Sequence, residues 1–544
     1  MKNKNSNENR RDFLRKTGLL GLGVAGVGSM GFTRQEQAVA DGPYNVLGFG
    51  AKGDGKTIDT KAIQNTIDKA AEDGGGTVYF PAGTYISGTL FLKSNITIHL
   101  EAGVILEGSK HLSDYPVTES NIRSYTDRYT NKSLIYAEGL ENISITGKGT
   151  IDGNGASFTG DHLRDDQGRI DKYDFYLARP YIIRMINCKN VLIRDVTILN
   201  SPMWVQHYLL CEDVCIDGIT VRSWVNHNND GIDIDACNRL IISNCNISSS
   251  DDAIVLKSTL DKPCQNITVT NCVLSTGCVA FKLGTESNGG FHNITFSNST
   301  IYDTRLAGIA LQIVDGGSLK NVTVTGISMD NSDCAIAVRL GNRARLFKEN
   351  MSKPGMGSMF NVIISNIQAT NIGKTGCSIT GLPSYPVRNL TLNNIRIQFE
   401  GGGTADLITR EIRELPEAFP KHSMFGILPA FGFFCRHVSG LRMENLNFSY
   451  ELPEYRPALY LENVKDTRIA DLRVSGETEA QSMMIIDRSQ DIIVSECNAL
   501  NHFEALGVIQ NDSKKIGFIN CNLLSKNTIY KSDESVNKSD ILIK

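Results

Sequence analysis

The stretch "NVLIRDVTILNS" (Asn190 to Ser201) contains two short runs in which apolar and polar residues alternate. Alternation with a period of two is typical of a β-strand that is buried on one side. The same pattern returns in "NISITGKGTIDG" (from Asn142), "RLIISNCNISSS" (from Arg239), "NITVTNCVLSTG" (from Asn266) and "NVTVTGISMDNS" (from Asn321). Most repeats start about 23 to 28 residues apart, within the usual range for solenoids. Each repeat is therefore predicted to be one coil of a solenoid built from short strands.

The repeat distinguishes among the solenoid and propeller folds. A leucine-rich repeat needs Leu at fixed positions and a helical segment, and a propeller needs longer units with blade signatures. Neither pattern occurs. We therefore expect an all-β fold, a right-handed parallel β-helix, in which inward side chains and the Asn residues at matching turns form ladders along the stacked coils.

The cysteines also follow the repeat. The chain has 13 cysteines, and Cys188, Cys245, Cys272, Cys497 and Cys521 occur at what the repeats indicate is one phase. Because a free thiol packs as a small apolar residue, we expect a buried ladder and not a set of disulfides. No pair of CxxC motifs has zinc-finger spacing, so no structural zinc is expected.

Both ends of the solenoid and one interruption have recognisable patterns. "TKAIQNTIDKAAED" (60–73) has helical spacing and is predicted to be a short N-terminal helix that caps the first coil. The break from about Gly401 to Arg436, with its core at 404–436, is too long for a turn and is predicted to overhang the cleft. Residues 41–544 are expected to form a single catalytic domain.

Residues 1–40 differ from the rest of the chain. Arg10 and Arg11 precede a Gly-rich apolar run that is too short and too weakly hydrophobic for a membrane span, and "AVA" (38–40) supplies small residues for cleavage. The segment resembles a twin-arginine signal peptide. We therefore expect export, to the periplasm or the medium, and no membrane span.

Composition excludes some partners. The 544 residues are 41% hydrophobic and 21% charged with a formal net charge of −4. The chain is long enough for a large core, and it lacks the basic field that nucleic acid binding requires. A monomer that binds no nucleic acid is expected.

Four carboxylates contain most of the functional information. "NHNNDGIDID" (226–235) and "SSSDDAIVLKS" (248–258) place Asp230, Asp233, Asp251 and Asp252 at matching points of successive coils. Carboxylates on adjacent coils repel, so one is expected to stay protonated while another is ionised, as glycoside hydrolysis requires. Calcium binding is the rival use of such a cluster, and capping of turns is the ordinary role of a single Asp.

These motifs, with "SPMWVQHYLLCEDV" (201–214) and the N-terminal "VLGFGAKGDGKTIDTKAIQNTID", resemble glycoside hydrolase family 28, the polygalacturonase and rhamnogalacturonan hydrolase family. The resemblance covers nearly the whole chain after residue 40. It implies that Asp251 is the general acid and that Asp230 and Asp252 activate water, with inversion at the anomeric carbon. Asp233 is expected to orient these groups or to cap a turn.

The chain departs from the family pattern on the next coils. Polygalacturonases carry Gly-His-Gly and then Arg-Ile-Lys, whose cations bind galacturonate. Here Val279 replaces the His, Ala310 the Arg and Gln312 the Lys. These replacements argue against typical recognition of galacturonate.

A second alignment supplies other cations. Counted from the first small residue of each strand, one offset on five coils holds Asp235, Lys257, Lys282, Gln312 and Arg339. Residues at one offset form a row on one face of the sheet. The row is predicted to bind a uronate or to balance the acids.

A few other residues complete the predicted site. His227 is three residues from Asp230 and is predicted to contact sugar, whereas His207 is more typical of a structural histidine. Trp204 and Trp224 are candidates for stacking on a pyranose, although core positions are the commoner role of Trp. Glu286 in "GTES" is a further candidate acid.

Taken together, the sequence predicts an exported inverting glycoside hydrolase that acts on pectic poly- or oligosaccharides, more plausibly a rhamnogalacturonan, a side chain or an oligomer end than plain homogalacturonan. No cofactor and no metal site are expected. The alternatives are a calcium-dependent pectate lyase and a non-catalytic carbohydrate-binding β-helix.

Overall fold

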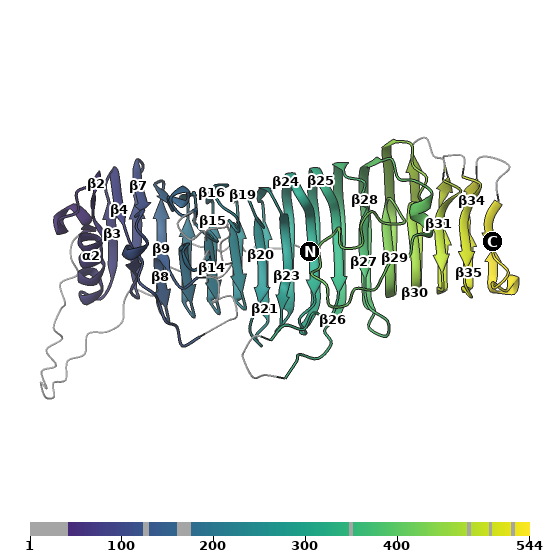
Figure 1. Cartoon of the computed structure of the whole chain (residues 1–544), viewed down its shortest axis with the longest axis horizontal. Coiled ribbons are helices and arrows are strands. Elements are labelled where there is room, and N and C mark those ends of the chain that lie inside the picture. The colour runs from purple at the N-terminus through teal and green to yellow at the C-terminus, as the bar shows by residue number, and fades with distance from the viewer. Residues whose placement is uncertain are drawn as a thin grey trace, which may run out of the picture. The chain divides into compact units, whose positions relative to one another are not determined.

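A computed structural model describes residues 42–122, 130–159, 176–346, 352–475, 480–499, 503–523 and 528–544, and residues from Gly42 onward form one compact unit. The predicted signal peptide and its cleavage site lie outside the described residues. Nearly every element is a short strand that pairs in parallel with the equivalent strand of the next coil, so the predicted right-handed parallel β-helix is confirmed (Figure 1).

Each complete coil contributes one strand to each of three faces. The first face contains the strands next to the predicted acids. Its strands are β5 (Leu90–Phe91), β8 (Ser133–Glu138), β11 (Tyr181–Ile186), β14 (Gln206–Leu209), β17 (Ile232–Asp235), β20 (Ile254–Ser258), β23 (Val279–Ser287), the ends of β24 (Phe291–Ile313) and β25 (Ser318–Leu340), β27 (Cys377–Thr380), the starts of β29 (Phe433–Leu452) and β30 (Leu459–Ser475), β31 (Ser482–Asp487), β34 (Ala505–Gln510) and β37 (Thr528–Ser532).

The second face follows the first around the coil. It consists of β1 (Tyr44–Asn45), β3 (Gly76–Phe80), β6 (Ile96–Leu100), β9 (Glu141–Gly147), β12 (Lys189–Arg194), β15 (Glu212–Asp217), β18 (Asn238–Ser243), β21 (Cys264–Thr270), parts of β24 and β25, the starts of β26 (Ser358–Ile372) and β28 (Val387–Gly401), parts of β29 and β30, β32 (Gln490–Ser495), β35 (Lys514–Ile519) and β38 (Ile541–Ile543).

The third face completes the coil. Its strands are β2 (Asp54–Ile58), β4 (Gly83–Ser87), β7 (Val104–Gly108), β10 (Thr150–Asp152), β13 (Thr197–Leu199), β16 (Thr220–Ser223), β19 (Asn246–Ser249), β22 (Val273–Thr276), parts of β24, β25, β26, β28, β29 and β30, β33 (Asn498–Ala499) and β36 (Asn522–Leu523). The turn from this face back to the first face is called the third corner below.

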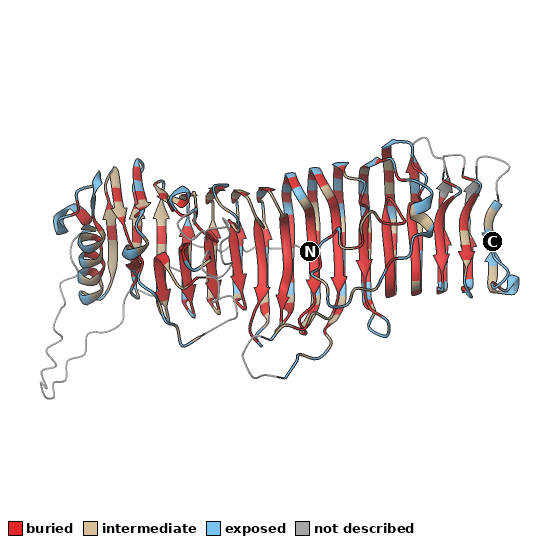
Figure 2. Ribbon diagram, viewed as in Figure 1, coloured by how far each residue is buried: buried red, intermediate tan, exposed pale blue. Residues whose placement is uncertain are grey.

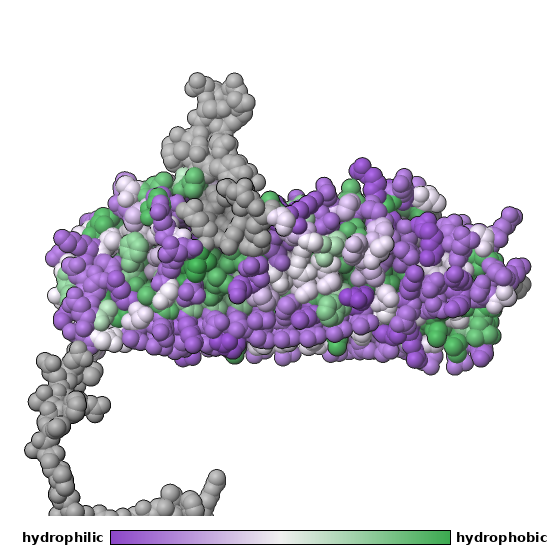
Figure 3. All heavy atoms as spheres, turned by 90° about the horizontal axis from the view of Figure 1, so that it is seen from below, coloured by the Kyte–Doolittle hydropathy of each residue, from purple (hydrophilic) through white to green (hydrophobic). Residues whose placement is uncertain are grey.

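Inward side chains form the core. The alternating residues of "NVLIRDVTIL" separate as the pattern predicts, because Val191, Ile193, Val196 and Ile198 are buried. Buried positions run along every strand face that points inward (Figure 2), and the outer surface seen in Figure 3 is mostly hydrophilic. No helix among the described residues is long and apolar enough to cross a membrane.

The predicted asparagine ladder is present. The side-chain amide of Asn142 donates to the side-chain oxygen of Asn95 at 2.7 Å, and the side-chain amide of Asn190 donates to the side-chain oxygen of Asn142 at 2.7 Å. A second run links Asn266, Asn293 and later turns in the same way. These residues have positive φ, a conformation that Asn tolerates better than most residues, so the ladder both shapes the turn and joins the coils.

The cysteines are free, as predicted, but they form more than one row. The register places Cys188, Cys211, Cys237 and Cys264 in one row where second-face strands begin. Cys245 instead stacks on Cys272, just before the third face. The single phase inferred from the repeats is therefore wrong. The prediction failed because similar Asn-Cys sequences occur at two different corners of the coil.

The predicted N-terminal helix and the predicted long break are both present. Helix α2 (Thr60–Glu72) buries Ile63, Ile67 and Ala70 against the first coils, which confirms the predicted cap. The long break contains only the short helix α4 (Asp406–Thr409), and the chain rejoins the first face at Phe433, three residues earlier than expected. Residues 404–432 are called the insertion below.

Candidate active site

A pocket of about 140 Å³ opens on the first face near β17, β20 and β23. Its lining includes the acids Asp230, Asp251, Asp252 and Glu286 and the lysines Lys257 and Lys282. The structure therefore brings together the three predicted catalytic residues and two of the predicted binding residues.

The stacking of coils brings the acids together. Asp230 lies just before β17, and Asp251 and Asp252 occupy the turn between β19 and β20. The amide of Gly231 donates to the backbone oxygen of Asp252 at 2.8 Å, which joins the two turns directly. Side chains that are about 20 residues apart in sequence thus line one pocket.

Asp251 is held by its own turn. One carboxylate oxygen accepts the backbone amide of Asp252 at 2.9 Å, and its backbone oxygen accepts the hydroxyls of Ser249 and Thr276. Burial and the neighbouring charge of Asp252 raise the pKa of Asp251 above its usual range. A raised pKa is what a carboxyl needs to act as a general acid.

Asp252 has the opposite surroundings. Its carboxylate accepts the ammonium of Lys282 at 2.8 Å and the backbone amide of Val279 at 3.2 Å. Both hydrogen bonds stabilise a negative charge. An ion-paired carboxylate next to a carboxyl with a raised pKa is the arrangement that acid–base hydrolysis uses.

Asp230 and Asp233 share the ammonium of Lys257, which lies 3.9 Å from Asp230 and 3.3 Å from Asp233. Burial raises the pKa of both carboxyls; the charge of Asp251 adds to the rise at Asp230, whereas Lys257 opposes it at Asp233. The ammonium also lies 4.7 Å from the ring centre of Trp204. The Trp204 ring therefore packs against the ammonium of Lys257 in the pocket wall.

Glu286 is a buried acid of the pocket. Its carboxylate lies 3.5 Å from Lys257 and 3.3 Å from Arg345. Burial alone would raise the pKa of Glu286, but Lys257, with Arg343, Lys282 and Arg345, outweighs it and lowers the pKa to about 2. Glu286 is thus a permanent anion and not a proton donor at neutral pH.

The predicted row of five residues is wrong for Lys282. Strand pairing puts Asp235 opposite Lys257, as predicted, but Lys282 opposite Val255, in the row of Asp233. The strand after the turn at Gly277 enters the sheet two residues later than the first-small-residue rule assumes. Lys282 keeps the outward face, since a shift of two preserves the face, and it reaches Asp252.

Gln312 and Arg339 lie in one row, but the structure does not bring them to the acids. Gln312 donates to the backbone oxygen of Pro420 at 2.5 Å, and Arg339 donates to the backbone oxygens of Glu414 and Leu415 at 2.8 and 3.1 Å. Both side chains are buried under the insertion, so their expected contact with substrate is replaced by a contact with this chain.

The histidines differ from each other. His227 is exposed and does not line the pocket, and its backbone oxygen accepts a hydrogen bond from Arg179 at 2.6 Å. His207 is fully buried, with a ring nitrogen 3.5 Å from Asp235, and packs against Trp204. His207 is therefore part of the support beneath the site, whereas the predicted sugar contact of His227 has no counterpart in the pocket.

Sequence reasoning missed five residues of the pocket lining, namely Tyr176, Met203, Asn228, Thr285 and Phe419. Asn228 stands in the quoted acidic motif, and its amide lies 3.5 Å from Asp251, so proximity to that motif was an available signal. Phe419 comes from the insertion, where nothing in the sequence indicates which residue returns to the pocket.

One group of side chains has metal-binding composition. Ligand atoms of Asp251, Asp252 and Cys278 lie within 4.8 Å of one another. Calcium takes six to eight oxygen ligands, and burial raises the pKa of the Cys278 thiol, so this group does not suit calcium.

Comparison with known proteins agrees with this geometry. The sequence model of glycosyl hydrolases family 28 matches residues 75–413. A probable polygalacturonase of Vitis vinifera is 29% identical over 375 residues, covering 65% of this chain and 74% of that protein. An exo-poly-alpha-D-galacturonosidase of Dickeya chrysanthemi is 25% identical over 435 residues, covering 65% and 71%.

Solved structures give the same result. The crystal structure of a hyperthermoactive exopolygalacturonase from Thermotoga maritima aligns with a TM-score of 0.57 and 25% identity. The alignment covers 66% of this chain and 87% of that one. The aligned coils are therefore similar to those of an exopolygalacturonase.

Proposed function

This chain belongs to glycosyl hydrolases family 28 and is a glycoside hydrolase, and we propose that it cleaves a pectic poly- or oligosaccharide by single displacement with inversion. Asp251 protonates the departing glycosidic oxygen. Asp230 and Asp252 hold the attacking water, and Asp252 takes its proton. The anomeric carbon is attacked from the face opposite the leaving group, so one step breaks the glycosidic bond and forms the new one.

The observation that best supports these roles is the contrast between the adjacent residues Asp251 and Asp252. Burial and a neighbouring charge favour the protonated form of Asp251, while Lys282 and the amide of Val279 favour the anion of Asp252. One polypeptide turn thus presents an acid and a base to the same pocket.

The insertion favours action at a chain end. Phe419 lines the pocket beside Lys282, and Gln312 and Arg339 hold the insertion over the first-face strands that follow β23. A long polymer would have to pass this segment to continue along the first face. We therefore favour release of terminal sugars or short oligomers, as the names of the exo-acting relatives also describe for those proteins.

The charges of the pocket favour a terminal sugar that is not a galacturonate. Five carboxylates, those of Asp230, Asp233, Asp251, Asp252 and Glu286, surround the ammonium groups of Lys257 and Lys282, and each lysine already lies within 4 Å of a carboxylate. Both ammonium groups therefore already have carboxylate partners, and neither offers an unpaired cation to a uronate. A rhamnogalacturonan, a neutral side chain or a modified oligomer end is the substrate class this charge pattern supports.

A release assay tests the function. Purified protein is incubated, in parallel with EDTA and with calcium, with homogalacturonan, rhamnogalacturonan and neutral pectic oligosaccharides, while new reducing ends and ultraviolet absorbance of unsaturated product are followed together. We expect reducing ends without absorbance, and their loss in Asp251→Asn. Calcium-dependent absorbance would instead identify a lyase, and binding without release would identify a non-catalytic β-helix.

Export and oligomeric state are further parts of the proposal. Arg10 and Arg11 of the "RRDFLRK" motif direct twin-arginine export, and the exported protein is a monomer. Replacement of both arginines by lysine is expected to retain the protein in the cytoplasm, as fractionation would detect. Gel filtration with light scattering measures the mass of the exported form, and a dimer mass would contradict the monomer.

A further inference from the structure

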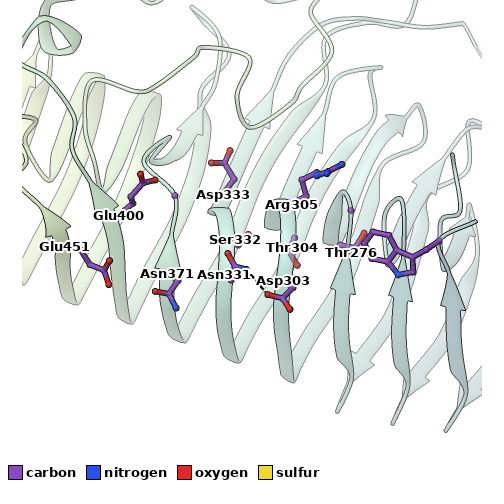
Figure 4. Close-up of a pocket in the computed structure, with 13 residues that line it drawn as sticks. Thr276, Asp303, Thr304, Arg305, Asn331, Ser332, Asp333, Asn371, Glu400 and Glu451 are labelled. Carbon is purple, nitrogen blue, oxygen red and sulfur yellow. Dashed lines mark hydrogen bonds between the residues drawn. The ribbon is translucent and has the colours of Figure 1, made fainter. Parts of the chain in front are cut away.

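A second groove, of about 640 Å³, runs along the third corner of the coils (Figure 4). It is larger than the pocket that holds the acids and shares no lining residue with it. One end touches the catalytic turn, because Thr276 lines the groove and its hydroxyl donates to the backbone oxygen of Asp251. The groove then continues toward the C-terminal coils.

Strand register organises the groove. Ser223, Ser249, Thr276, Thr304, Ser332, Ile372, Phe399 and Tyr450 are paired in one continuous row. The next residue on each coil lies at the third corner, and these positions include Trp224, Gly277, Arg305, Asp333, Gly373, Glu400 and Glu451 of the lining. Figure 4 shows Arg305 and Asp333 on successive coils and Glu400 two coils beyond Asp333. The groove therefore offers one position per coil, about 4.8 Å apart.

Trp224 provides a flat apolar surface at the first end. Its side chain is 52% exposed, which is unusual for Trp, and its ring nitrogen donates to Ser248 at 2.8 Å. This hydrogen bond fixes the orientation of the ring. Gly277 lies against it, since a Cβ there would be 3.3 Å from the ring and 2.4 Å from the backbone oxygen of Ser250. A fixed, exposed aromatic ring is a platform on which a pyranose can stack.

Hydrogen-bonding groups follow at the next coils. Among the described residues, Arg305 and Glu400 have no side-chain hydrogen bond or ion pair. Asp303 accepts the amide of Asn331 at 2.7 Å, and Glu451 accepts that of Gln398 at 3.3 Å, which leaves oxygen lone pairs on both carboxylates. Sugar hydroxyls are suitable partners for these groups, because each can donate to a carboxylate and accept from a guanidinium.

The charge of the groove distinguishes among glycans. Its lining has four carboxylates, Asp303, Asp333, Glu400 and Glu451, against the single guanidinium of Arg305. A polyuronate would be repelled along the coils from Asp303 to Glu451, whereas an uncharged sugar chain would not. The coil spacing is also close to the length of one sugar residue in an extended chain.

We propose that this groove binds an uncharged glycan chain that lies along the axis of the coils, with one sugar stacked on Trp224. Neutral side chains of pectic polymers have this chemistry. Because the groove begins at the catalytic turn, it would hold such a side chain while another part of the polymer occupies the acid pocket. The site is separate from the acids, so its ligand does not depend on the roles proposed for them.

Binding to the catalytically inactive full chain tests the proposal. Asp251→Asn protein is titrated calorimetrically with oligosaccharides of a neutral galactan and a neutral arabinan, and with oligogalacturonate, each with and without EDTA. We expect one neutral glycan to bind without calcium and oligogalacturonate not to compete. Adding Trp224→Ala or Glu400→Ala is expected to weaken that binding about tenfold each.

Controls keep the result interpretable. Tyr385→Ala removes another aromatic residue, 50% exposed, that lines neither cavity, and should leave binding unchanged. Trp224→Phe should restore part of the affinity. Glu400→Ala lies several coils from the acids, and in the active background it should leave hydrolysis of a short oligosaccharide unchanged. Absence of neutral-glycan binding, a calcium requirement, preference for oligogalacturonate or indifference to both groove variants would each overturn the proposal.

Discussion

At the scale of single residues, the site depends on how neighbouring charges differ. Asp251 and Asp252 are adjacent in sequence, but only Asp252 receives the ammonium of Lys282 and the amide of Val279. The same field keeps Glu286 ionised beside Lys257. Small differences in position thus give side chains of the same type different electrostatic surroundings.

Asp251→Asn should abolish release of reducing ends and also stabilise the protein at neutral pH. Burial raises the pKa of Asp251, so the folded state loses stability as pH rises from the ordinary carboxyl range through the raised value. The variant should therefore gain on the order of 1 kcal/mol near pH 7 and nothing well below pH 4. Denaturant unfolding at both pH values measures the difference. An equal effect at both would show that charge repulsion is not its cause.

The pH profile of the wild-type enzyme should report the same group. Since the general acid must be protonated, activity should fall as pH rises through the pKa of Asp251, which burial and Asp252 hold above the ordinary range. Lys282→Met removes a cation that lowers the pKa of Asp251 and is expected to move the basic limb of kcat toward higher pH. Initial rates of the wild type and the variant on one substrate across the pH range test both expectations.

Glu286→Gln should be strongly destabilising above about pH 5. The pKa of Glu286 is lowered to about 2, so its ionised form stabilises the fold above the unfolded-state pKa, and that stability is lost as pH falls toward 2. The expected loss at neutral pH is about 3 kcal/mol. Urea unfolding would measure it, with Glu451→Gln, an exposed acid, as the control.

At the scale of elements, the insertion and the strands it covers act together. The side chain of Arg339 is buried and donates to three backbone oxygens, of which two belong to the insertion. The insertion contains a single short helix, α4, and side chains of the sheet attach it to the coils. The asparagine ladders also attach one coil to the next at the second face. There each side-chain amide donates to the asparagine side chain of the preceding coil.

Arg339→Ala should release the insertion without unfolding the coils. Loss of its hydrogen bonds leaves buried carbonyl groups unpaired, so proteolysis within 404–432 should become faster and the fraction of terminal-sugar product should fall. Product chromatography and limited proteolysis check these outcomes. Arg388→Ala, which removes an exposed arginine from the second face, is the matched control. Unchanged products from a cleaved insertion would contradict its proposed role in closing the site.

At the scale of the whole molecule, stability comes from repeated coils with a common apolar core and not from crosslinks. All 13 cysteines are free, and most are buried within that core. Reductant is therefore expected to leave the thermal unfolding midpoint unchanged, and thiol titration of the denatured protein without reductant should find all thirteen thiols. Fewer thiols, together with a midpoint that falls on reduction, would show that disulfides form.

The sequence by itself determined the fold, the cap and the meeting of Asp230, Asp251 and Asp252 in one pocket. Alternation along strands such as 190–199 and a regular repeat are local properties, and stacking of identical coils makes Asp230 and Asp251 neighbours without further information. For the same reason the buried, free cysteines and the asparagine ladder could be predicted. The repeats alone did not show that the cysteines occupy two different corners of the coil.

Only the tertiary structure decided which charges meet. Turns of unequal length shift the register, so Lys282 joins the row of Asp233 and reaches Asp252 instead of extending the row of Lys257. The insertion is distant in sequence from Gln312 and Arg339. Its backbone oxygens nevertheless accept the hydrogen bonds that these two side chains would otherwise offer to a substrate. Periodicity places residues on a face, but it contains no information about which irregular segment folds back over that face; this depends on contacts between distant parts of the chain.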